Sequence, residues 1–444
     1  MKIIIDGFGL SMSHAGLPVY FRNIIQAINA NHLTQEKDIT FEILVPPDDY
    51  LTEPIQKKGF VKKFALESER VSVKILQYPF FIQLLFKLLQ GPFLFLLLDG
   101  VEDLFKINIY LWLVYVFSPK VRSMQQGVDA VLFLHQYSMN PNIPGKKIAV
   151  VHDVMSWYYY RGGKKQNGLK QYIYSFFLNQ LRTFDLIIAV SLSTKADLIT
   201  EFGMNPDKIQ VIYENVSPSY QHFFDARTDP KQQETVSQKM SEIQTRYQLP
   251  ERYILLSNPF NERKNSQVIL QSLPMLEAKN IPIVFISDAK RPREQRIKEK
   301  ILSLLKNTDL VRFLEIESSE DLAYVYHQAL CFCTFSVKEG FGLPPLEALA
   351  CGTLVVTSRM TTFLEILKDF NVDFVNPFSY SRVEESLKHI SELSAEQRKR
   401  LIEENDKQMK AFCEKFSWEA ISSEMILSLT NTVEQNKLRT DLSL

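Results

Sequence analysis

The sequence predicts an α/β protein of two domains, each built on a parallel sheet. Its 444 residues are too many for one ordinary core, since a domain usually has about 150 residues. Short apolar segments alternate with amphipathic segments in both halves of the chain, which is the pattern of strands and helices in parallel sheets. A polar, glycine-free stretch from 225 to 247 separates the halves. We therefore predict domains at 1–224 and 248–414, linked by 225–247.

The first half contains two strand-loop-helix units. Residues 2–6 form a short apolar strand, which is followed by a polar turn and an amphipathic run from 19 to 30. A second apolar strand covers 185–190 and leads into a helix at 195–202, for which Ser191 or Ser193 supplies the N-cap.

The second half repeats this order of elements. Strands are predicted at 253–257, 282–287 and 330–337, with helical segments between them. Parallel sheets of this kind bind ligands at the carboxyl ends of their strands. We expect the two domains to face each other across a cleft lined by those ends.

Composition excludes several classes of protein. Hydrophobic residues make up 45% and charged residues 23%, as in soluble globular proteins. The 51 basic residues balance the 51 acidic ones, so no general field attracts nucleic acid. The four cysteines lack the spacing of a zinc site and suit a reducing compartment, and the first residues do not resemble an export signal. We expect a cytoplasmic protein without a nucleic-acid partner.

The apolar stretch from 78 to 117 is the part of the sequence that could span or contact a membrane. Polar and charged residues interrupt it before it reaches about 18 clean apolar positions, so a spanning helix is not predicted. Two interpretations stay open. The stretch forms core-facing helices, or it forms an aromatic-rich interfacial patch that makes a peripheral contact with the cytoplasmic face of a membrane and serves a lipid-linked acceptor.

The segment from 330 to 358 is predicted to carry the chemistry. It has the pattern of a strand, a glycine turn, a short helix and a second strand. Gly340 and Gly342 let the backbone approach a ligand, Pro344 suits the first helical position, and Gly352 suits the residue after the helix. A helix that begins at such a turn binds anions with its positive end.

Two carboxylates, Glu339 and Glu347, bracket this turn. They would repel a diphosphate directly, so we expect them to accept hydrogen bonds from hydroxyl groups of a sugar and a ribose on either side of it. The segment therefore predicts a site for a nucleoside diphosphate sugar. The alternative is structural, with Glu347 complementing the helix dipole and Glu339 ending the strand in solvent.

Arg263, Lys264 and His152 are further candidates, because each follows a predicted strand. An isolated basic pair is usually a solvated turn, but its position after the strand at 253–257 favours a functional role. His152 follows the strand at 147–151, where either a substrate contact or a packing role is open. Asp153 is expected to fix the turn or to orient His152.

The run from Glu339 to Val356, together with the Arg263-Lys264-Asn265 loop and Phe416-Ser417-Trp418-Glu419, resembles the retaining GT-B glycosyltransferases of family 4. The resemblance extends over most of the chain and is poor at 40–130. It implies two Rossmann-like domains facing each other across a cleft, with 415–440 returning to the first domain as a helix.

The resemblance also assigns roles. It implies that Glu347 holds the ribose hydroxyls and that Glu339 holds the hydroxyls of the donor sugar. Lys264 with Arg263 would neutralise the diphosphate, and His152 would lie beside the donor sugar and the acceptor. The remaining donor-binding positions would be backbone groups at Phe341, Gly342, Leu343 and Gly16. Pro18 stands where a second glycine is common, and it has no amide to offer a phosphate.

The implied activity is retaining transfer of a hexose, such as mannose, glucose or rhamnose, from a nucleotide diphosphate sugar. The acceptor would be a hydroxyl group of a glycan or a lipid-linked intermediate in polysaccharide biosynthesis. No Asp-x-Asp occurs in the sequence, so we expect no metal and no cofactor beyond the nucleotide sugar. Two alternatives are a catalytically inactive GT-B binding subunit and a GT-B sugar-nucleotide epimerase.

Overall fold

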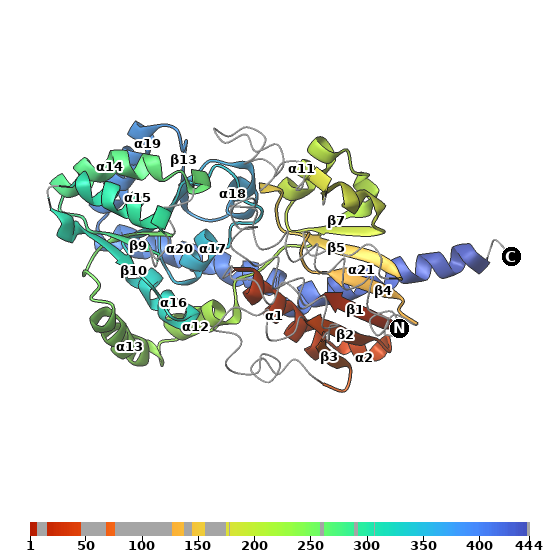
Figure 1. Cartoon of the computed structure of the whole chain (residues 1–444). Helices are drawn as coiled ribbons and strands as arrows, with labels where there is room; N and C mark the ends of the chain where they lie inside the picture. Colours follow the sequence, from red (N-terminus) through yellow and green to blue (C-terminus); the bar gives the residue numbers. More distant parts are fainter. Residues whose placement is uncertain are drawn as a thin grey trace. The chain divides into compact units, whose positions relative to one another are not determined.

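The computed structural model divides the chain into two compact units. The first unit comprises Met1–Tyr213 and Ser417–Leu444, and the second comprises Glu214–Phe416. Figure 1 shows their helices and strands. The structure describes residues 1–6, 16–45, 68–75, 127–136, 144–155, 175–176, 178–257, 262–287, 292–305 and 307–441. The stretch at 78–117, with its two open interpretations, lies outside these residues.

The first unit contains a parallel sheet in the order β3-β2-β1-β4-β5-β6-β7. The order reverses between β1 and β4, where Ile5 pairs with Leu132. Residues Ile3 to Ile5 and Ala130 to Phe133 have no exposed surface, because helices cover such sheets on both faces. The strands are β1 (Lys2–Asp6), β2 (Thr40–Val45), β3 (Val71–Ile75), β4 (Ala130–Phe133), β5 (Lys146–Val151), β6 (Leu186–Ala189) and β7 (Ile209–Val211).

Helices α1 (Gly16–Ala30) and α21 (Trp418–Asp441) pack against each other in the first unit (Figure 1). Asn31 joins them, since its side-chain amide donates to the hydroxyls of Ser422 and Ser423 at 2.8 Å. The predicted return of the C-terminal helix is confirmed. The unit also contains α2 (His32–Glu36), η3 (Leu181–Thr183), η4 (Pro206–Lys208) and α11 (Leu192–Phe202), which Ser191 caps.

The second unit contains a parallel sheet in the order β10-β9-β8-β11-β12-β13. The order reverses between β8 and β11, so the loops after these two strands lie at the switch point where α/β sheets bind ligands. The strands are β8 (Ile254–Ser257), β9 (Ile283–Ile286), β10 (Val311–Leu314), β11 (Cys331–Thr334), β12 (Val355–Ser358) and β13 (Val372–Val375). The predicted α/β class with two parallel sheets is confirmed.

The helices of the second unit begin earlier than the sequence predicted. Tyr220 and Phe223 of α12 are buried and contact the rings of Tyr326 and Tyr324, which lie in α16. The predicted boundary at 224 is therefore wrong, because this packing draws α12 into the second unit. The helices are α12 (Pro218–Thr228), α13 (Gln233–Arg246), α14 (Ser266–Ala278), α15 (Pro292–Ser303), α16 (Ser319–Gln328), α17 (Leu343–Ala350), α18 (Thr361–Ile366), α19 (Tyr380–Glu392), α20 (Ala395–Lys415), η5 (Glu262–Lys264) and η6 (Thr308–Leu310).

The predicted linking stretch at 225–247 is the end of α12 followed by α13. Val236 and Ile243 of α13 are buried, and α13 packs on α12 and α16. The stretch is polar because most of its other residues face solvent.

Within the part of the chain that the structure describes, no helix is long and apolar enough to cross a membrane.

Candidate functional site

The predicted strand, turn and helix are present as β11, a turn that ends at Gly342, and α17. Gly342 is the N-cap, with φ of +94°, and a β-carbon there would overlap the ring of Phe363. Pro344 occupies the second helical position and not the first, because the helix starts at Leu343. Pro344 and Pro345 have no amide hydrogen, so the N–H groups at this end belong to Leu343 and the turn before it.

The turn carries an ion cluster formed by Glu339, Arg263 and Lys264. The ammonium group of Lys264 lies 2.7 Å from Oε1 of Glu339, and Arg263 pairs with Oε2 of the same carboxylate. A backbone hydrogen bond joins the two segments that carry these residues, since Val337 donates its N–H to the carbonyl oxygen of Arg263 at 3.0 Å. The three predicted residues therefore meet at the switch point between β8 and β11.

Glu339 is ionised in this cluster. Its side chain is only 12% exposed, and burial by itself would raise the pKa of the carboxyl. The charges of Lys264 and Arg263 outweigh burial and lower the pKa of Glu339 to about 2. The alternative of a solvated strand end does not describe this side chain.

Glu347, in the second turn of α17, has the opposite electrostatic environment. Burial raises the pKa of its carboxyl from the ordinary 4.5 to about 7. The hydroxyl of Tyr326 donates to its Oε2 at 3.4 Å, and Tyr326 itself is 1% exposed. Near neutral pH this carboxyl is therefore partly protonated and partly ionised. A ligand that donates hydrogen bonds to it favours the ionised form.

His152 follows β5 in the first unit, at the carboxyl end of the strand as predicted. Its Nε2 lies 3.0 Å from the carbonyl oxygen of Leu134, and its ring meets that of Tyr20 edge-on at 4.7 Å between centroids. Asp153 fixes the turn, since its Oδ1 accepts the N–H of Met155 at 2.9 Å. The predicted structural role of Asp153 is confirmed by this contact.

Gly16, also in the first unit, is the first residue of α1. Pro18 lies in the first turn of that helix, where an amide hydrogen has no intrahelical partner. The sequence predicted an amphipathic run from 19 to 30, whereas the helix begins at Gly16 and includes Pro18, which is compatible with a first helical turn.

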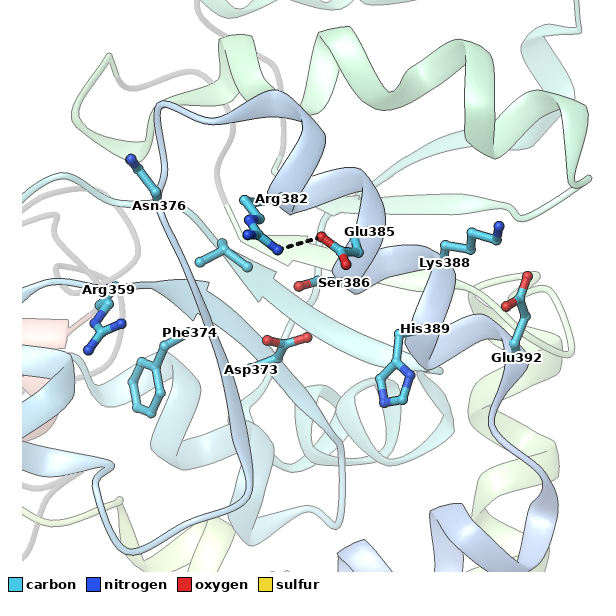
Figure 2. A pocket seen from close by; sticks show the side chains of 11 residues that line it. Arg359, Asp373, Phe374, Asn376, Arg382, Glu385, Ser386, Lys388, His389 and Glu392 are labelled. Atoms are coloured by element: carbon cyan, nitrogen blue, oxygen red, sulfur yellow. Dashed lines mark hydrogen bonds and ion pairs between the residues drawn. The ribbon is translucent and has the colours of Figure 1, made fainter.

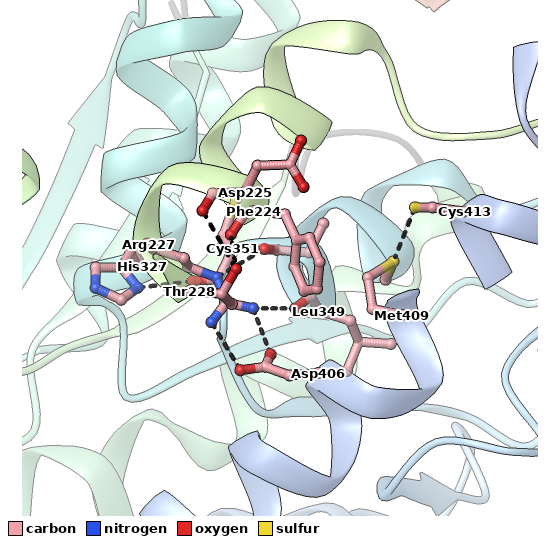
Figure 3. A network of polar contacts seen from close by, with 11 residues as sticks. Phe224, Asp225, Arg227, Thr228, His327, Leu349, Cys351, Asp406, Met409 and Cys413 are labelled. Carbon is pink, nitrogen blue, oxygen red and sulfur yellow. Dashed lines mark hydrogen bonds and ion pairs between the residues drawn. The ribbon is translucent and has the colours of Figure 1, made fainter. Parts of the chain in front are cut away.

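Nothing in the sequence indicated a role for Arg227, which donates hydrogen bonds to carbonyl groups at the C-terminal end of α17. Arg227 donates to the carbonyl oxygen of Ala350 at 2.8 Å and forms two hydrogen bonds with the carboxylate of Asp406 (Figure 3). Its side chain is 6% exposed. Gly352 follows the helix with φ of +76°, and a β-carbon there would lie 2.9 Å from Nη1 of Arg227. No pattern in the sequence links Arg227, Asp406 and Gly352. The sequence did predict Gly352 as the residue after the helix.

The second unit also has a surface pocket of about 690 Å³ at the edge of its sheet (Figure 2). Its walls are β13 and α19, and its charged side chains include the exposed ion pair of Arg382 and Glu385. None of the predicted site residues lines it. The lining residues are Arg359, Asp373, Phe374, Val375, Asn376, Arg382, Glu385, Ser386, Lys388, His389 and Glu392.

Metal ligands do not gather at any of these places. Among the described residues, no group of three or more His, Cys, Asp or Glu side chains has an arrangement that could hold a metal ion. Two cationic groups, those of Arg263 and Lys264, pair with Glu339 at the turn.

Solved structures with this fold include glycosyltransferases. The HepE protein (Alr3699) of Anabaena, in complex with UDP-glucose, aligns with 97% of this chain and 100% of its own, with a TM-score of 0.65 at 14% identity. WaaG, a glycosyltransferase involved in lipopolysaccharide biosynthesis, aligns with 96% of this chain and 99% of its own, with a TM-score of 0.64 at 14% identity. At these identities the likeness shows the fold alone.

Curated relatives include mannosyltransferases and D-inositol 3-phosphate glycosyltransferases. The serotype-specific mannosyltransferase WbdA of Escherichia coli is 26% identical over 236 residues, which are 51% of this chain and 27% of WbdA. The O-antigen chain mannosyltransferase RfbU of Salmonella typhimurium is 23% identical over 291 residues, which are 65% of this chain and 72% of RfbU. The match to WbdA thus spans about a quarter of that protein's length.

Two family models match different parts of the chain. The model described as Glycosyltransferase Family 4 matches residues 106–220, and the model described as Glycosyl transferases group 1 matches residues 239–408, which include the ion cluster and α17. With the fold and the turn between Glu339 and Glu347, these matches show that the chain belongs to the family 4 glycosyltransferases of the GT-B fold.

Proposed function

We propose that this protein transfers a mannosyl residue from a nucleoside diphosphate sugar to a hydroxyl group of a growing glycan or a lipid-linked acceptor, with retention of the anomeric configuration. The names of the curated relatives support mannose among the hexoses that the sequence left open. The name of RfbU, an O-antigen chain mannosyltransferase, supports a glycan acceptor.

The observation that carries the proposal is the pairing of two basic side chains with one carboxylate beside the turn before α17. Two cations, Arg263 and Lys264, meet one carboxylate, Glu339, close to a helix end that is itself positive. Cations at the N-terminus of a helix are unfavourable unless an anion joins them. A diphosphate would supply that anion. Glu339 and Glu347 would then accept hydrogen bonds from hydroxyl groups of the sugar and of the ribose, on either side of the diphosphate.

In this mechanism the chain's cations stabilise the leaving group. As the bond between the anomeric carbon and the diphosphate breaks, Lys264 and Arg263 balance the charge that develops on the phosphate oxygens. The acceptor hydroxyl attacks the face that the diphosphate leaves, and the departing phosphate takes its proton. The products are the glycoside with a retained configuration and the nucleoside diphosphate.

Covalent catalysis by Glu339 is disfavoured by its environment. A carboxylate held by an ammonium and a guanidinium group, with its pKa lowered to about 2, is a weak nucleophile. We propose that Glu339 instead accepts hydrogen bonds from the donor sugar. Because the two basic side chains can balance the diphosphate, we also propose that turnover does not need a divalent metal, so it should persist in EDTA.

The direct test mixes the protein with GDP-, UDP- and dTDP-linked hexoses and follows nucleotide release with a panel of glycan acceptors. We expect release from a mannosyl donor and an α-linked product by NMR, since such donors are α-linked. The Glu339→Ala and Glu347→Ala variants should lose activity, and Glu385→Ala, at an exposed position, should keep it. Full activity of either site variant would contradict the assignment.

Other outcomes of the same experiment identify the alternatives. Nucleotide-sugar binding without transfer to any acceptor would indicate an inactive binding subunit. Epimerised nucleotide sugar, formed without acceptor, would indicate an epimerase.

A peripheral contact with the cytoplasmic face of a membrane through residues 78–117 is a separate proposal. It is tested by co-sedimentation with vesicles of anionic lipid, using variants that replace Phe80, Phe81 and Phe93 with serine. Unchanged sedimentation would end this proposal and leave the transfer reaction untouched.

A further inference from the structure

The turn that carries the two basic side chains of the ion cluster is held at both ends. Arg263 and Lys264 lie in η5, between β8 and α14. At one end, the carbonyl oxygen of Arg263 accepts the N–H of Val337, which follows β11, at 3.0 Å. At the other end, Asn265 donates from Nδ2 to the carbonyl oxygen of Pro377, which follows β13, at 2.6 Å. The turn is therefore tied to the loops after two other strands.

The peptide group between Pro377 and Phe378 has a side-chain amide on each of its polar atoms. Its carbonyl oxygen accepts from Asn265, and its N–H donates to Oδ1 of Asn376 at 3.0 Å. Pro377 itself is buried. A peptide group whose donor and acceptor are both paired is held in its orientation. It therefore offers Asn265 a fixed acceptor.

The backbone of Asn265 explains why an asparagine suits this position. Asn265 is the N-cap of α14 and has a left-handed conformation, with φ of +53° and ψ of +45°. Asparagine adopts this conformation more readily than most other residues with a side chain. Glycine also adopts it but brings no amide, and an ionised aspartate has no hydrogen to donate to the carbonyl of Pro377. Asparagine supplies both the turn and the tie.

The tie acts directly on the basic pair. Lys264 is the residue before Asn265, and its ammonium group lies 2.7 Å from Oε1 of Glu339. A displacement of Asn265 therefore moves the backbone that carries this ammonium group, while the turn stays attached only through Arg263 and Val337.

We propose that Asn265 is a positioning residue: its side-chain amide holds η5 in the place where Arg263 and Lys264 meet Glu339 and the diphosphate of the donor. This inference rests on the proposed function for the diphosphate. The dependence of the turn on Asn265 does not rest on it.

The first test needs no substrate. Asn265→Gly keeps the left-handed backbone and removes the tie, and hydrogen–deuterium exchange of the Val337 amide is followed by mass spectrometry. Val337 is distant from Asn265 in the sequence but donates to Arg263, so its exchange reports whether the turn keeps its place. We expect exchange about 2- to 10-fold faster, the factor that a weakened hydrogen bond gives. An unchanged rate would overturn the proposal.

The second test compares ligands with and without the diphosphate. Calorimetric titration measures the affinity for GDP and UDP, and for guanosine and uridine. Asn265→Gly should weaken the nucleoside diphosphate that binds by about tenfold, because charge-assisted hydrogen bonds to its phosphates are misplaced. The affinity for the matching nucleoside should stay the same. An unchanged affinity for the diphosphate, or an equal loss for the nucleoside, contradicts a positioning role.

A matched control lies at the other end of α14. Asn280 also has a left-handed backbone, with φ of +52°, and its side chain is exposed. Asn280→Gly makes the same substitution in the same conformation without touching the tie to Pro377. It should keep both the Val337 exchange rate and the nucleotide affinity. The same changes in this variant as in Asn265→Gly would reduce Asn265 to a residue of general stability.

Asn376→Ala tests the tie from its other side and replaces Asn265→Gly if that variant does not fold. It leaves Asn265 in place but releases the N–H of the peptide group that accepts from it. Exchange of Val337 and the affinity for the nucleoside diphosphate should change in the same directions as in Asn265→Gly. No change in either would overturn the proposal.

The two proposals fail in different ways. If neither nucleoside diphosphate binds and no nucleotide sugar is turned over, the proposed function fails, while the exchange of Val337 still decides whether Asn265 holds the turn. If a nucleoside diphosphate binds and the exchange of Val337 ignores Asn265, only the present inference fails.

Discussion

Helix α17 has an ion cluster at each end, and the two clusters differ in their charge balance. At the C-terminal end, one arginine, Arg227, meets one carboxylate, Asp406, and also donates to carbonyl groups of the last helical turn. At the N-terminal end, Arg263 and Lys264 share the single carboxylate of Glu339. A cation at the C-terminus of a helix interacts favourably with the negative end of the helix dipole. Cations near the N-terminus interact unfavourably with its positive end.

The difference is consistent with a structural role for the cluster of Arg227 and with the proposed ligand-binding role for the cluster of Glu339. The cluster of Arg227 is internally neutral and completes the hydrogen bonding of α17. In the cluster of Glu339, two basic side chains pair with one carboxylate, and we propose that a diphosphate joins them. Variants at the two ends should therefore affect different measurements.

The largest effect is expected on stability at the C-terminal end. Arg227→Met leaves Asp406 without its partner and the carbonyl groups of Leu349 and Ala350 without this donor. Removing one member of a buried pair costs about 3–5 kcal/mol in the free energy of unfolding. Urea unfolding measures it, and the double variant with Asp406→Leu should recover part of the loss. A loss below about 1 kcal/mol would contradict the structural role of the cluster.

The next largest effect is expected on the rate, at the N-terminal end. Lys264→Ala removes a charge that balances the leaving diphosphate, so kcat/KM should fall by about 10²- to 10³-fold. The melting temperature should change little, since Arg263 still pairs with Glu339. Lys279→Ala, which breaks an exposed pair with Glu392, is the control and should be fully active. A large stability loss in Lys264→Ala would remove the distinction between the two ends.

A smaller effect concerns Glu347 and depends on pH. Its pKa is about 7 in the folded protein against an ordinary 4.5, so the folded state holds this proton more tightly than the unfolded state. Stability therefore falls as the pH rises from about 4.5 to about 7, by on the order of 3 kcal/mol. Glu347→Gln cannot ionise, so thermal unfolding should show that it gains stability over the natural protein between pH 5 and pH 8.

The affinity for nucleotide should depend on pH in the opposite direction to stability: it should rise as the pH rises. Ribose hydroxyls donate to the ionised carboxylate, so the affinity for a nucleoside diphosphate should weaken as the pH falls below about 7. Calorimetric titration of the natural protein and of Glu347→Gln tests this. An affinity that is equally strong at pH 5.5 and pH 8 in the natural protein would show that the ionised form is not the one that binds.

The smallest effect is expected at the pocket beside β13. Arg382 and Glu385 form an exposed pair there, with 68% and 67% of their side chains exposed. Such pairs contribute about 0–1 kcal/mol, so Arg382→Met should leave both unfolding and transfer nearly unchanged. A loss of activity in this variant would indicate that the pocket in Figure 2 takes part in the reaction.

Contiguous features of the site were predictable from the sequence. The turn from Glu339 to Glu347 and the pair of Arg263 and Lys264 each follow a strand whose apolar pattern is clear, and parallel strands bring their carboxyl ends to one edge. Gly352 after α17 was predicted on the same basis.

Features that join distant segments were not predictable. Arg227 and Asp406 are 179 residues apart, and Gln136 makes its two hydrogen bonds across the gap between β4 and β5. Arginine, aspartate and glutamine are common in exposed helices and loops, so composition gives no signal that these particular ones are buried. The domain boundary was placed too late for the same reason, since the aromatic packing of α12 on α16 links residues about a hundred positions apart.

The sequence by itself determined the α/β class, the strand, turn and helix of the proposed donor site, and the two glutamates that bracket the turn, because apolar periodicity, glycine turns and strand ends are local patterns. Tertiary structure alone decided the charge states. It set Glu339 against two cations and buried the carboxyl of Glu347, so that two glutamates eight residues apart have pKa values of about 2 and about 7. A pKa depends on burial and on charges that neighbouring segments bring near, and no local pattern of residues fixes those.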